Sequence, residues 1–259
     1  MASFLQNLKR LFQPKRKHVP FKPSWEDILE ENLAIYNSLP RELKSKLRTR
    51  ISDFIPNVYW EGVKGLELTE EMMVIVAAQA CLLILNMEGS PYARLKTVIL
   101  FPEVFVHSET SSEDGLIVSE RKARVSGLSY DRGTVSLAWD EARNGASNKY
   151  DGFNVVIHEF AHQLDQDDGY ANGAPILRRP QDYQQWNAVM QQEFETLSRD
   201  SSHGKATVLD DYGATNLAEF FAVATETFFE KARKLHKHHP ELYSIMQQYY
   251  QLDPKNWAN

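Results

Sequence analysis

The stretch Val155–Leu164, VVIHEFAHQL, places two histidines four residues apart in a largely apolar segment. Because four residues turn a helix by about 400°, the side chains of His158 and His162 leave nearly the same face, one turn apart. Two imidazoles at that spacing can bind one tetrahedral zinc ion. Glu159 lies about 100° further round the helix, so it is placed to take a proton from a water molecule. The stretch therefore predicts the zinc-binding helix of a hydrolase.

A second interpretation of the same stretch is a helix with two partly exposed histidines and a surface glutamate. The neighbouring residues are apolar, among them Val156, Phe160 and Leu164, and they predict that most of the helix surface is buried. Burying imidazoles and a carboxylate costs free energy that a metal ion or other polar partners must offset. We therefore favour the zinc-binding helix.

A catalytic zinc ion usually has three protein ligands, so one more must come from elsewhere in the chain. The stretch Asn216–Ala222, NLAEFFA, offers Glu219, which we favour as the third ligand. Asn216 and Glu219 also have the spacing of a capping box, in which Glu219 would only satisfy a backbone amide. Glu226 lies seven residues further along the same face, either as the alternative ligand or as a carboxylate that holds a histidine N–H. Three more remote possibilities are His203, Asp210 and Asp211.

Two other polar clusters have simpler explanations. Asp165 follows His162 by three residues, and it or a neighbour, Asp167 or Asp168, could orient an imidazole. Ordinary turn chemistry explains these aspartates at least as well. The histidines next to Pro240 are interleaved with lysines, which is typical of a basic helix end rather than of a metal site. They are His236, His238 and His239.

Composition excludes several classes of protein. The 259 residues carry a net charge of −6, so no overall basic field indicates direct contact with nucleic acid. The one cysteine, Cys81, excludes an internal disulfide and fits a reducing compartment. The N-terminus lacks the apolar stretch of a secretory signal, and the apolar segment Met72–Leu85 is too short to span a bilayer. We expect a cytoplasmic protein without a transmembrane segment.

The pattern of apolar residues predicts an α+β fold. Residues 1–22 form a basic tail, either solvated or an amphipathic helix on a membrane surface or a partner. Residues 23–259 form a single domain. Within it we expect an N-terminal helical layer over residues 24–88, a small antiparallel sheet over residues 96–139 and the active-site helices over residues 154–259.

Individual elements follow from the same pattern. Ser24 is placed to cap the first helix. The alternating segment Thr134–Trp139 predicts a strand, and we expect an extended peptide to add beside it. Further helices are expected at Pro40–Phe54, Thr69–Asn86, Asp182–Leu197 and Asn216–Leu235.

Residues 151–165 resemble the Mlc titration factor A family of bacteria, as do residues 214–223, 65–69 and 77–81. The likeness covers most of residues 24–254. That family is similar to the catalytic domain of anthrax lethal factor, a zincin in which two histidines and a distant glutamate bind zinc. The resemblance implies that the ligands of Zn²⁺ are His158, His162 and Glu219.

The same resemblance implies roles for two further residues. Glu159 would be the general base. Tyr212, seven residues before Glu219, matches a tyrosine of lethal factor and could donate a hydrogen bond to the developing oxyanion. A tyrosine packed on a surface loop is the equally simple alternative.

The residues predict a zinc-dependent peptidase. The resemblance implies a zincin-like fold and an activity that is aminopeptidase-like or directed at small peptides. The resemblance also implies binding to the repressor Mlc in the control of sugar uptake. The alternative is a non-catalytic protein that sequesters the repressor and keeps a vestigial or coupled zinc site. A purely structural zinc site would need a fourth protein ligand, for which Cys81 and His107 are the available donors.

Overall fold

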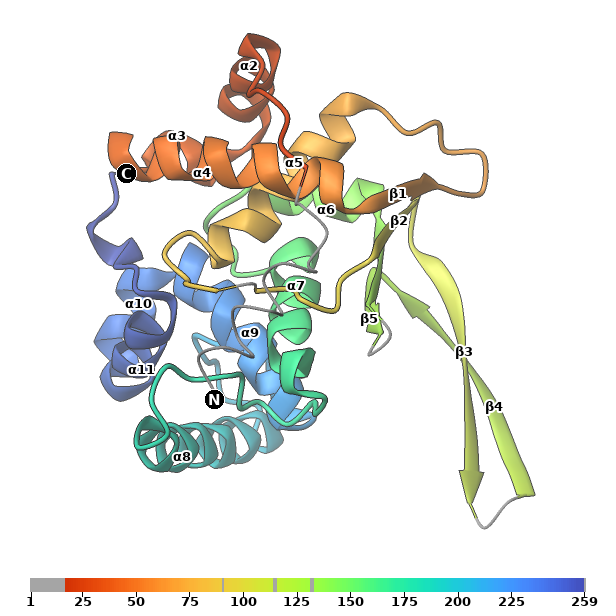
Figure 1. Cartoon of the computed structure of the whole chain (residues 1–259). Helices are drawn as coiled ribbons and strands as arrows, with labels where there is room; N and C mark the ends of the chain where they lie inside the picture. Colours follow the sequence, from red (N-terminus) through yellow and green to blue (C-terminus); the bar gives the residue numbers. More distant parts are fainter. Residues whose placement is uncertain (1–16, 90, 114–115, 131–132, 259) are drawn as a thin grey trace, which may run out of the picture.

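The first part of the chain folds into helices, because apolar residues recur there at helical spacing. The computed structural model describes residues 17–89, 91–113, 116–130 and 133–258, without the side chains of residues 107–124. The predicted helical layer is formed by α2 (Pro23–Asn32), α3 (Ala34–Ser38), α4 (Arg41–Phe54) and α5 (Glu70–Leu83), drawn in red to orange in Figure 1.

Two predicted features at the start of this layer need correction. Helix α2 begins at Pro23 and its N-cap is Lys22, so Ser24 lies inside the helix and caps nothing. Of the predicted basic tail, residues 1–16 lie outside the described residues. Val19 and Phe21 pack against the core, so this end of the tail belongs to the folded body.

The four-stranded sheet is mixed rather than antiparallel, which corrects the prediction. Its strands are β1 (Tyr59–Gly62), β2 (Thr97–Phe101), β6 (Thr134–Ala138) and β5 (Gly127–Tyr130), in that spatial order. The pairs β1–β2 and β2–β6 are parallel, and only β5–β6 is antiparallel. Helix α5 makes the crossover that parallel β1 and β2 require. The short β1 lies within the segment that we predicted to be entirely helical.

Strand β6 cannot accept a peptide as predicted, because it lies inside the sheet with β2 on one side and β5 on the other. Trp139, expected to end this strand, instead begins helix α6 (Trp139–Ser147), which the sequence did not predict. The outer strands of this sheet are β1 and β5. An added peptide strand would therefore need to pair at β1 or β5.

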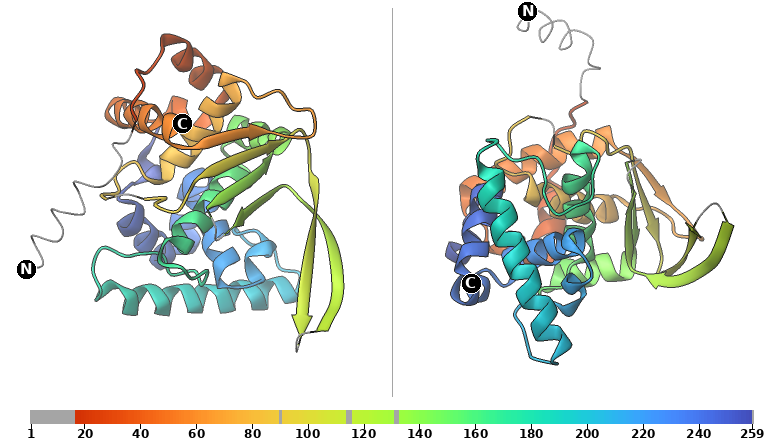
Figure 2. Two further views of the ribbon diagram at one scale, coloured as in Figure 1. Left: turned by 45° about the vertical axis from the view of Figure 1, so that its right-hand side comes forward. Right: turned by 90° about the horizontal axis from the view of Figure 1, so that it is seen from below.

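A long antiparallel hairpin leaves the body of the molecule between β2 and β5. It consists of β3 (Phe105–Glu113) and β4 (Leu116–Val125), with a change of register after Ser111. Figures 1 and 2 show it extending past the sheet as a separate two-stranded arm. The sequence placed this region in the sheet without resolving the hairpin.

The remaining helices pack against the other side of the core. They are α7 (Val155–Asp165), α8 (Asp182–Ser202), α9 (Leu217–Glu230), α10 (Ala232–His238) and α11 (Pro240–Tyr250). Helices α7 and α9 lie side by side at the centre of the molecule (Figure 1). The predicted helix Asn216–Leu235 is divided at Lys231, where the backbone leaves the helical conformation.

The most apolar segment of the chain is a core helix, as predicted. Thr69 caps α5 by accepting a hydrogen bond from the N–H of Met72, at 3.2 Å. Every residue of α5 from Val74 to Leu83 is buried. Within the described residues, no helix has both the length and the apolar character needed to cross a membrane.

Candidate metal centre

Asn154 starts the helix that carries both histidines. Its side-chain oxygen accepts a hydrogen bond from the N–H of Ile157 at 3.1 Å, which satisfies one of the free amides of the first turn. Val156, Phe160 and Ala161 are fully buried, so α7 runs through the core as its apolar neighbours predicted. His158 and His162 consequently lie in a largely water-free environment.

The two histidines of α7 meet Glu219 of α9. The Nε2 atoms of His158 and His162 lie 3.2 Å apart, and Oε2 of Glu219 lies 3.0 Å from the first and 3.3 Å from the second. Two ligand atoms that are each about 2.05 Å from a tetrahedral ion lie about 3.3 Å apart. The three donor atoms therefore already have the mutual spacing that a tetrahedral metal ion requires.

Glu226 is on the opposite side of the His158 ring. Its Oε1 lies 2.7 Å from Nδ1 of His158, and its Oε2 accepts a hydrogen bond from the backbone N–H of Asn154. Nδ1 must carry a proton to donate to this carboxylate, which leaves a lone pair on Nε2. In the neutral imidazole, that lone pair and an oxygen of Glu219 face each other and can bind one metal ion together. Without a metal ion, a second ring proton, which the raised pKa of His158 favours, lies between the two atoms. Glu226 therefore matches the interpretation as a carboxylate that holds a histidine N–H. It does not lie beside the Nε2 atoms, where a metal ligand would be.

Glu219 combines features of a metal ligand and of a capping residue, the two roles considered from its sequence. Its backbone N–H donates to the side chain of Asn216 at 3.0 Å, so Asn216 caps α9. The reciprocal half of a capping box is missing, because the Glu219 carboxylate turns toward the two imidazoles. The cap fixes the first turn of α9 and with it the position of the carboxylate.

Burial and charge shift the protonation equilibria in opposite directions at this site. Burial lowers the pKa of His158, but hydrogen bonds to Glu219 and Glu226 outweigh it and raise this pKa well above its usual value. Burial raises the pKa of Glu219, but the two imidazoles outweigh it and bring this pKa to about 2. Glu219 is thus an anion across the whole physiological range, as a metal ligand must be.

Glu159 is a buried carboxylate next to this group. Burial raises its pKa, an effect that the two imidazoles partly oppose and the carboxylates of Glu219 and Glu226 reinforce. It lines a cavity of about 250 Å³ together with His158, Glu226 and part of β5. A carboxyl group with a raised pKa in a cleft is suited to general acid–base work.

Gly127 of β5 is a functional position that sequence reasoning missed. A Cβ atom there would lie 2.6 Å from the Glu159 carboxylate and 2.7 Å from Val155, so only glycine lets β5 approach α7 this closely. Gly127 lies within residues 96–139, which we predicted to form the sheet, and no role was assigned to it. Nothing local in the sequence indicates that it meets Glu159, which lies 32 positions later.

Tyr212 lies at the mouth of the same cavity. Its ring centroid is 5.9 Å from that of His158, and the residue is 56% exposed. Asp210 accepts a hydrogen bond from the Tyr212 N–H at 2.9 Å and fixes this short 3₁₀ turn. The phenol therefore lies beside His158 rather than on a distant surface.

A second buried polar group lies behind the metal centre. The side-chain amide of Asn154 donates to Gln79 at 2.8 Å and to Glu230 at 3.0 Å, while its backbone N–H donates to Glu226. Asn154 thereby joins α5, α7 and α9. Its polar neighbours come from distant parts of the chain, so no local pattern predicts this network.

The other residues considered from sequence lie elsewhere. Asp165 accepts a hydrogen bond from the backbone of Gly173 at 2.9 Å, and no hydrogen bond joins it to His162. Nδ1 of His203 lies 2.6 Å from the carbonyl of Arg199, and Nδ1 of His239 lies 2.7 Å from Glu193. Among the described residues, the group that could hold a metal ion is His158, His162 and Glu219.

The sequence matches one family of known proteins over nearly its whole length. Residues 6–251 match the family described as glucose-regulated metallo-peptidase M90. The chain belongs to this family. The mixed α+β fold and the group of two histidines and a glutamate fit an M90 metallopeptidase, and together with the family they indicate a bound metal ion.

Relatives of this M90 member cover most of its length. An uncharacterized protein of Synechocystis sp. is 40% identical over 247 residues, which are 95% of this chain and 88% of the relative. Mlc titration factor A of Pectobacterium atrosepticum is 30% identical over 233 residues, 85% of each chain. Mlc titration factor A of Yersinia pestis is 26% identical over 259 residues, 97% of this chain and 94% of the relative. The resemblance inferred from the motifs is confirmed.

Proposed function

We propose that this M90 member is a zincin-like, zinc-dependent peptidase in which His158, His162 and Glu219 bind the ion. The observation that carries the proposal is the convergence of three donor atoms within 3.3 Å of one another, beside a buried carboxylate in a cavity. Two imidazole nitrogens and one carboxylate oxygen are a donor set that suits Zn²⁺ and leaves a coordination position open for catalysis.

The protein's own residues divide the chemical work. When bound, zinc supplies a Lewis acid that polarises the scissile carbonyl and increases the acidity of water. Glu159 takes the proton from water and later gives it to the leaving amine, a role that its raised pKa favours. Tyr212 donates a hydrogen bond to the oxygen on which negative charge develops. Glu226 keeps His158 in the tautomer whose Nε2 is free to bind metal.

The substrate is proposed to add along β5 rather than β6. Ala138 of β6 donates to the carbonyl of Ser126 at 2.8 Å, so Ser126 faces β6. Because the two faces alternate along an antiparallel strand, Gly127 and Ser129 direct their N–H and C=O groups toward the outer edge. An extended peptide that pairs there passes directly over Glu159. Small peptides cleaved in an aminopeptidase-like manner are the substrates that the family likeness favours.

Metal content and turnover of purified variants test the proposal. Wild type is expected to hold one zinc ion per chain, and His158→Ala and Glu219→Ala to lose it. Glu159→Gln keeps the shape of the side chain but removes the carboxylate that accepts a proton. The variant should therefore retain zinc and lose peptide hydrolysis. A Glu159→Gln protein that hydrolyses peptides like wild type, or a wild type without bound metal, would contradict the proposal.

A regulatory role is the second candidate, because two of the relatives are named Mlc titration factor A. We propose that the chain binds the Mlc repressor in the cytoplasm and that binding is separable from hydrolysis. The Glu159→Gln variant discriminates the two roles. If it still captures purified Mlc with the affinity of wild type, repressor binding does not depend on turnover; if it does not, the two are coupled.

A further inference from the structure

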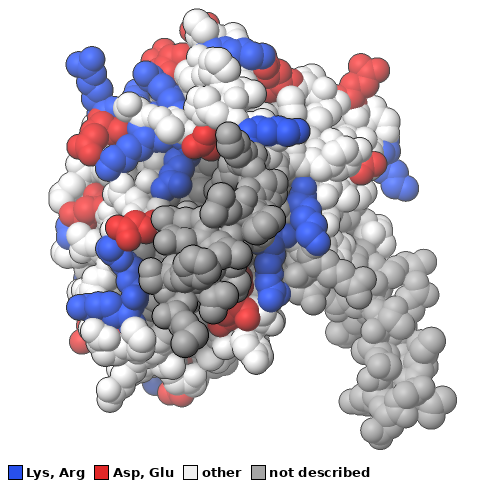
Figure 3. Space-filling model, viewed as in Figure 1, with Lys and Arg blue, Asp and Glu red and all other residues white. Residues whose placement is uncertain are grey.

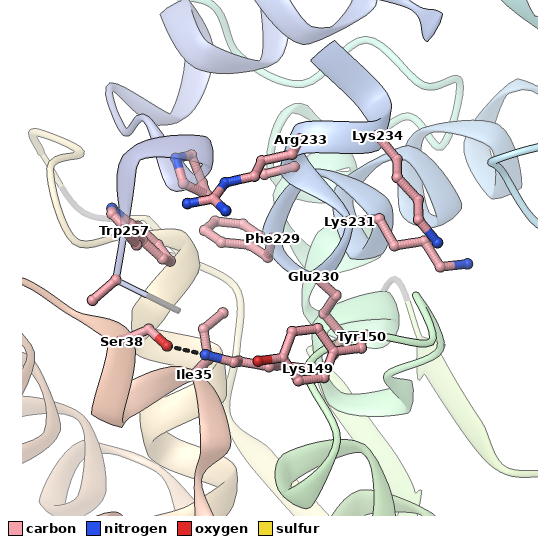
Figure 4. Close-up of a pocket in the computed structure, with 13 residues that line it drawn as sticks. Ile35, Ser38, Lys149, Tyr150, Phe229, Glu230, Lys231, Arg233, Lys234 and Trp257 are labelled. Atoms are coloured by element: carbon pink, nitrogen blue, oxygen red, sulfur yellow. Dashed lines mark hydrogen bonds between the residues drawn. The ribbon is translucent and has the colours of Figure 1, made fainter. Parts of the chain in front are cut away.

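A second cavity, which shares no lining residue with the cavity beside the metal centre, has several basic residues in its lining. It has a volume of about 210 Å³, room for roughly seven water molecules at 30 Å³ each. Helix α10 and the end of α9 form one wall, and α3, the segment after α6 and the C-terminal segment form the others (Figure 4). Four of its lining residues are basic: Lys149, Lys231, Arg233 and Lys234.

None of these four cations forms an ion pair with a described residue. Lys149 donates to the hydroxyl of Ser38, and Arg233 donates to the carbonyl of Lys255 at 3.0 Å, both neutral partners. The acidic lining residue is Glu230, which is only 9% exposed. Burial raises its pKa well above the usual value and so favours its uncharged form. The cavity therefore concentrates positive charge with little to neutralise it.

This concentration runs against the charge of the whole molecule. The chain carries a net charge of −6, and the face shown in Figure 3 mixes acidic and basic side chains over its described part. Figure 4 shows Arg233 and Lys149 on opposite sides of the hollow, whereas Lys231 and Lys234 extend away from Phe229 and Trp257. The positive charges of Arg233 and Lys149 repel each other in the free protein. An anion bound between them would relieve that repulsion and make charge-assisted hydrogen bonds.

The other walls are apolar and aromatic. Phe229 and Trp257 are 4% and 7% exposed, and Ile35 closes the side next to Ser38. Figure 4 shows Phe229 between Arg233 and Lys149, so an apolar surface lies between two cations from different parts of the chain. A ligand that fits such a lining has a compact anionic group and a small organic body.

We propose that this cavity is a binding site for a small organic phosphate, whose phosphate group lies between Arg233 and Lys149 and whose body packs on Phe229 and Trp257. A phosphate monoester carries up to two negative charges, which suits several cations better than a single carboxylate does. The hollow is too small for a groove that follows a nucleic-acid backbone. This site is independent of the proposed peptidase function, since none of its lining residues belongs to the metal centre.

Calorimetric titration of the zinc-loaded protein with phenyl phosphate tests the site. Phenyl phosphate should bind saturably and more tightly than either inorganic phosphate or phenol, because only it uses both parts of the lining. Arg233→Met and Lys149→Met should each weaken binding about tenfold, the loss expected for one charge-assisted contact. Lys237→Met is the matched control, since Lys237 is exposed on the same helix α10 and does not line the cavity.

Several outcomes would overturn this assignment. They are the absence of saturable binding, equal affinity for phenol or for inorganic phosphate, and the same loss in Lys237→Met as in Arg233→Met. Arg233 is exposed, so its variant is expected to fold, which circular dichroism and thermal melting verify. Binding that persists in Arg233→Met and Lys149→Met but disappears in His162→Ala would assign the phosphate to the metal centre instead.

Discussion

Gly127 of β5 lies so close to Glu159 of α7 that a Cβ atom on the glycine would be 2.6 Å from both Cγ and Oε1 of the glutamate. Real Cβ contacts of that length do not occur without movement. The glutamate is buried and cannot swing into solvent, so the strand or the carboxylate would have to shift. Strand β5 can lie this close to the Glu159 carboxylate only because Gly127 has no side chain.

Gly127→Ala is expected to lower kcat by about a hundredfold, since a displacement of about 1 Å at a catalytic group has that effect. The three metal-binding atoms come from α7 and α9 and do not touch Gly127, so zinc content should stay at one ion per chain. Steady-state kinetics and metal analysis of the same preparation check both parts. Unchanged kcat would show that the Glu159 carboxylate does not need its present position.

Glu226→Gln is expected to weaken zinc binding about 10- to 100-fold, the usual effect of removing a carboxylate that holds a zinc-bound histidine. The amide can still occupy the space, but it loses the charge that favours a proton on Nδ1 of His158. Competition with a chromogenic chelator measures the affinity. Glu230→Gln is the matched control, because Glu230 lies one turn further along α9 and accepts a hydrogen bond from Asn154 rather than from an imidazole. An equal loss in both variants would refute a specific role for Glu226.

Tyr212→Phe is expected to lower kcat by about 10²- to 10³-fold if the phenol stabilises the oxyanion, the range found for a lost oxyanion donor. KM and zinc content should change little, because the hydroxyl acts on the transition state rather than on ground-state binding. Tyr170→Phe provides the control, since Tyr170 is also strongly exposed and does not line the cavity. A proportional rise in KM with unchanged kcat would reduce Tyr212 to substrate binding.

Asp165 makes stability depend on pH. Burial raises its pKa from 3.8 to about 6, and its Oδ1 has no hydrogen-bond partner among the described residues. A carboxyl group whose pKa is higher in the folded state stabilises the fold below pH 3.8, and this contribution is lost as pH rises through about 6. The shift corresponds to at most about 3 kcal/mol. Compared with wild type, Asp165→Asn should therefore become relatively more stable between pH 4 and 7.

Urea unfolding of wild type and Asp165→Asn at pH 4, 5, 6 and 7 measures this difference directly. Comparing the two proteins at each pH cancels the titration of groups that they share. A difference in the free energy of unfolding that stays constant over this range would show that Asp165 keeps an ordinary pKa in the folded protein.

The parts of the site that follow from local spacing could be predicted from the sequence. His158 and His162 are four residues apart on one helix, and helix geometry alone brings their rings together. The apolar run of α5 was likewise recognisable as a buried helix, because its length and composition exclude the alternatives. These predictions depend on residues that are neighbours in the chain.

The parts that depend on tertiary contacts could not be predicted in this way. Parallel pairing joins β1 to β2 across the whole of α5, and a four-residue strand carries too short a pattern to reveal it. The same limit applies to Gly127 and Asn154, whose partners lie on other elements. Glu219 was favoured as the third ligand from its own stretch of sequence, although its capping-box spacing left a structural role open, and the family likeness implied the same ligand.

Cys81 can report on transient opening of the protein core. The thiol is fully buried in α5 and burial raises its pKa, so reagents that attack thiolates cannot modify it while the core is closed. Because the chain has one cysteine, each labelled molecule gains a single, countable mass. The rate of labelling therefore measures how often the core around Cys81 opens. The decrease of this rate on adding zinc would show how strongly metal binding between α7 and α9 stabilises the closed core.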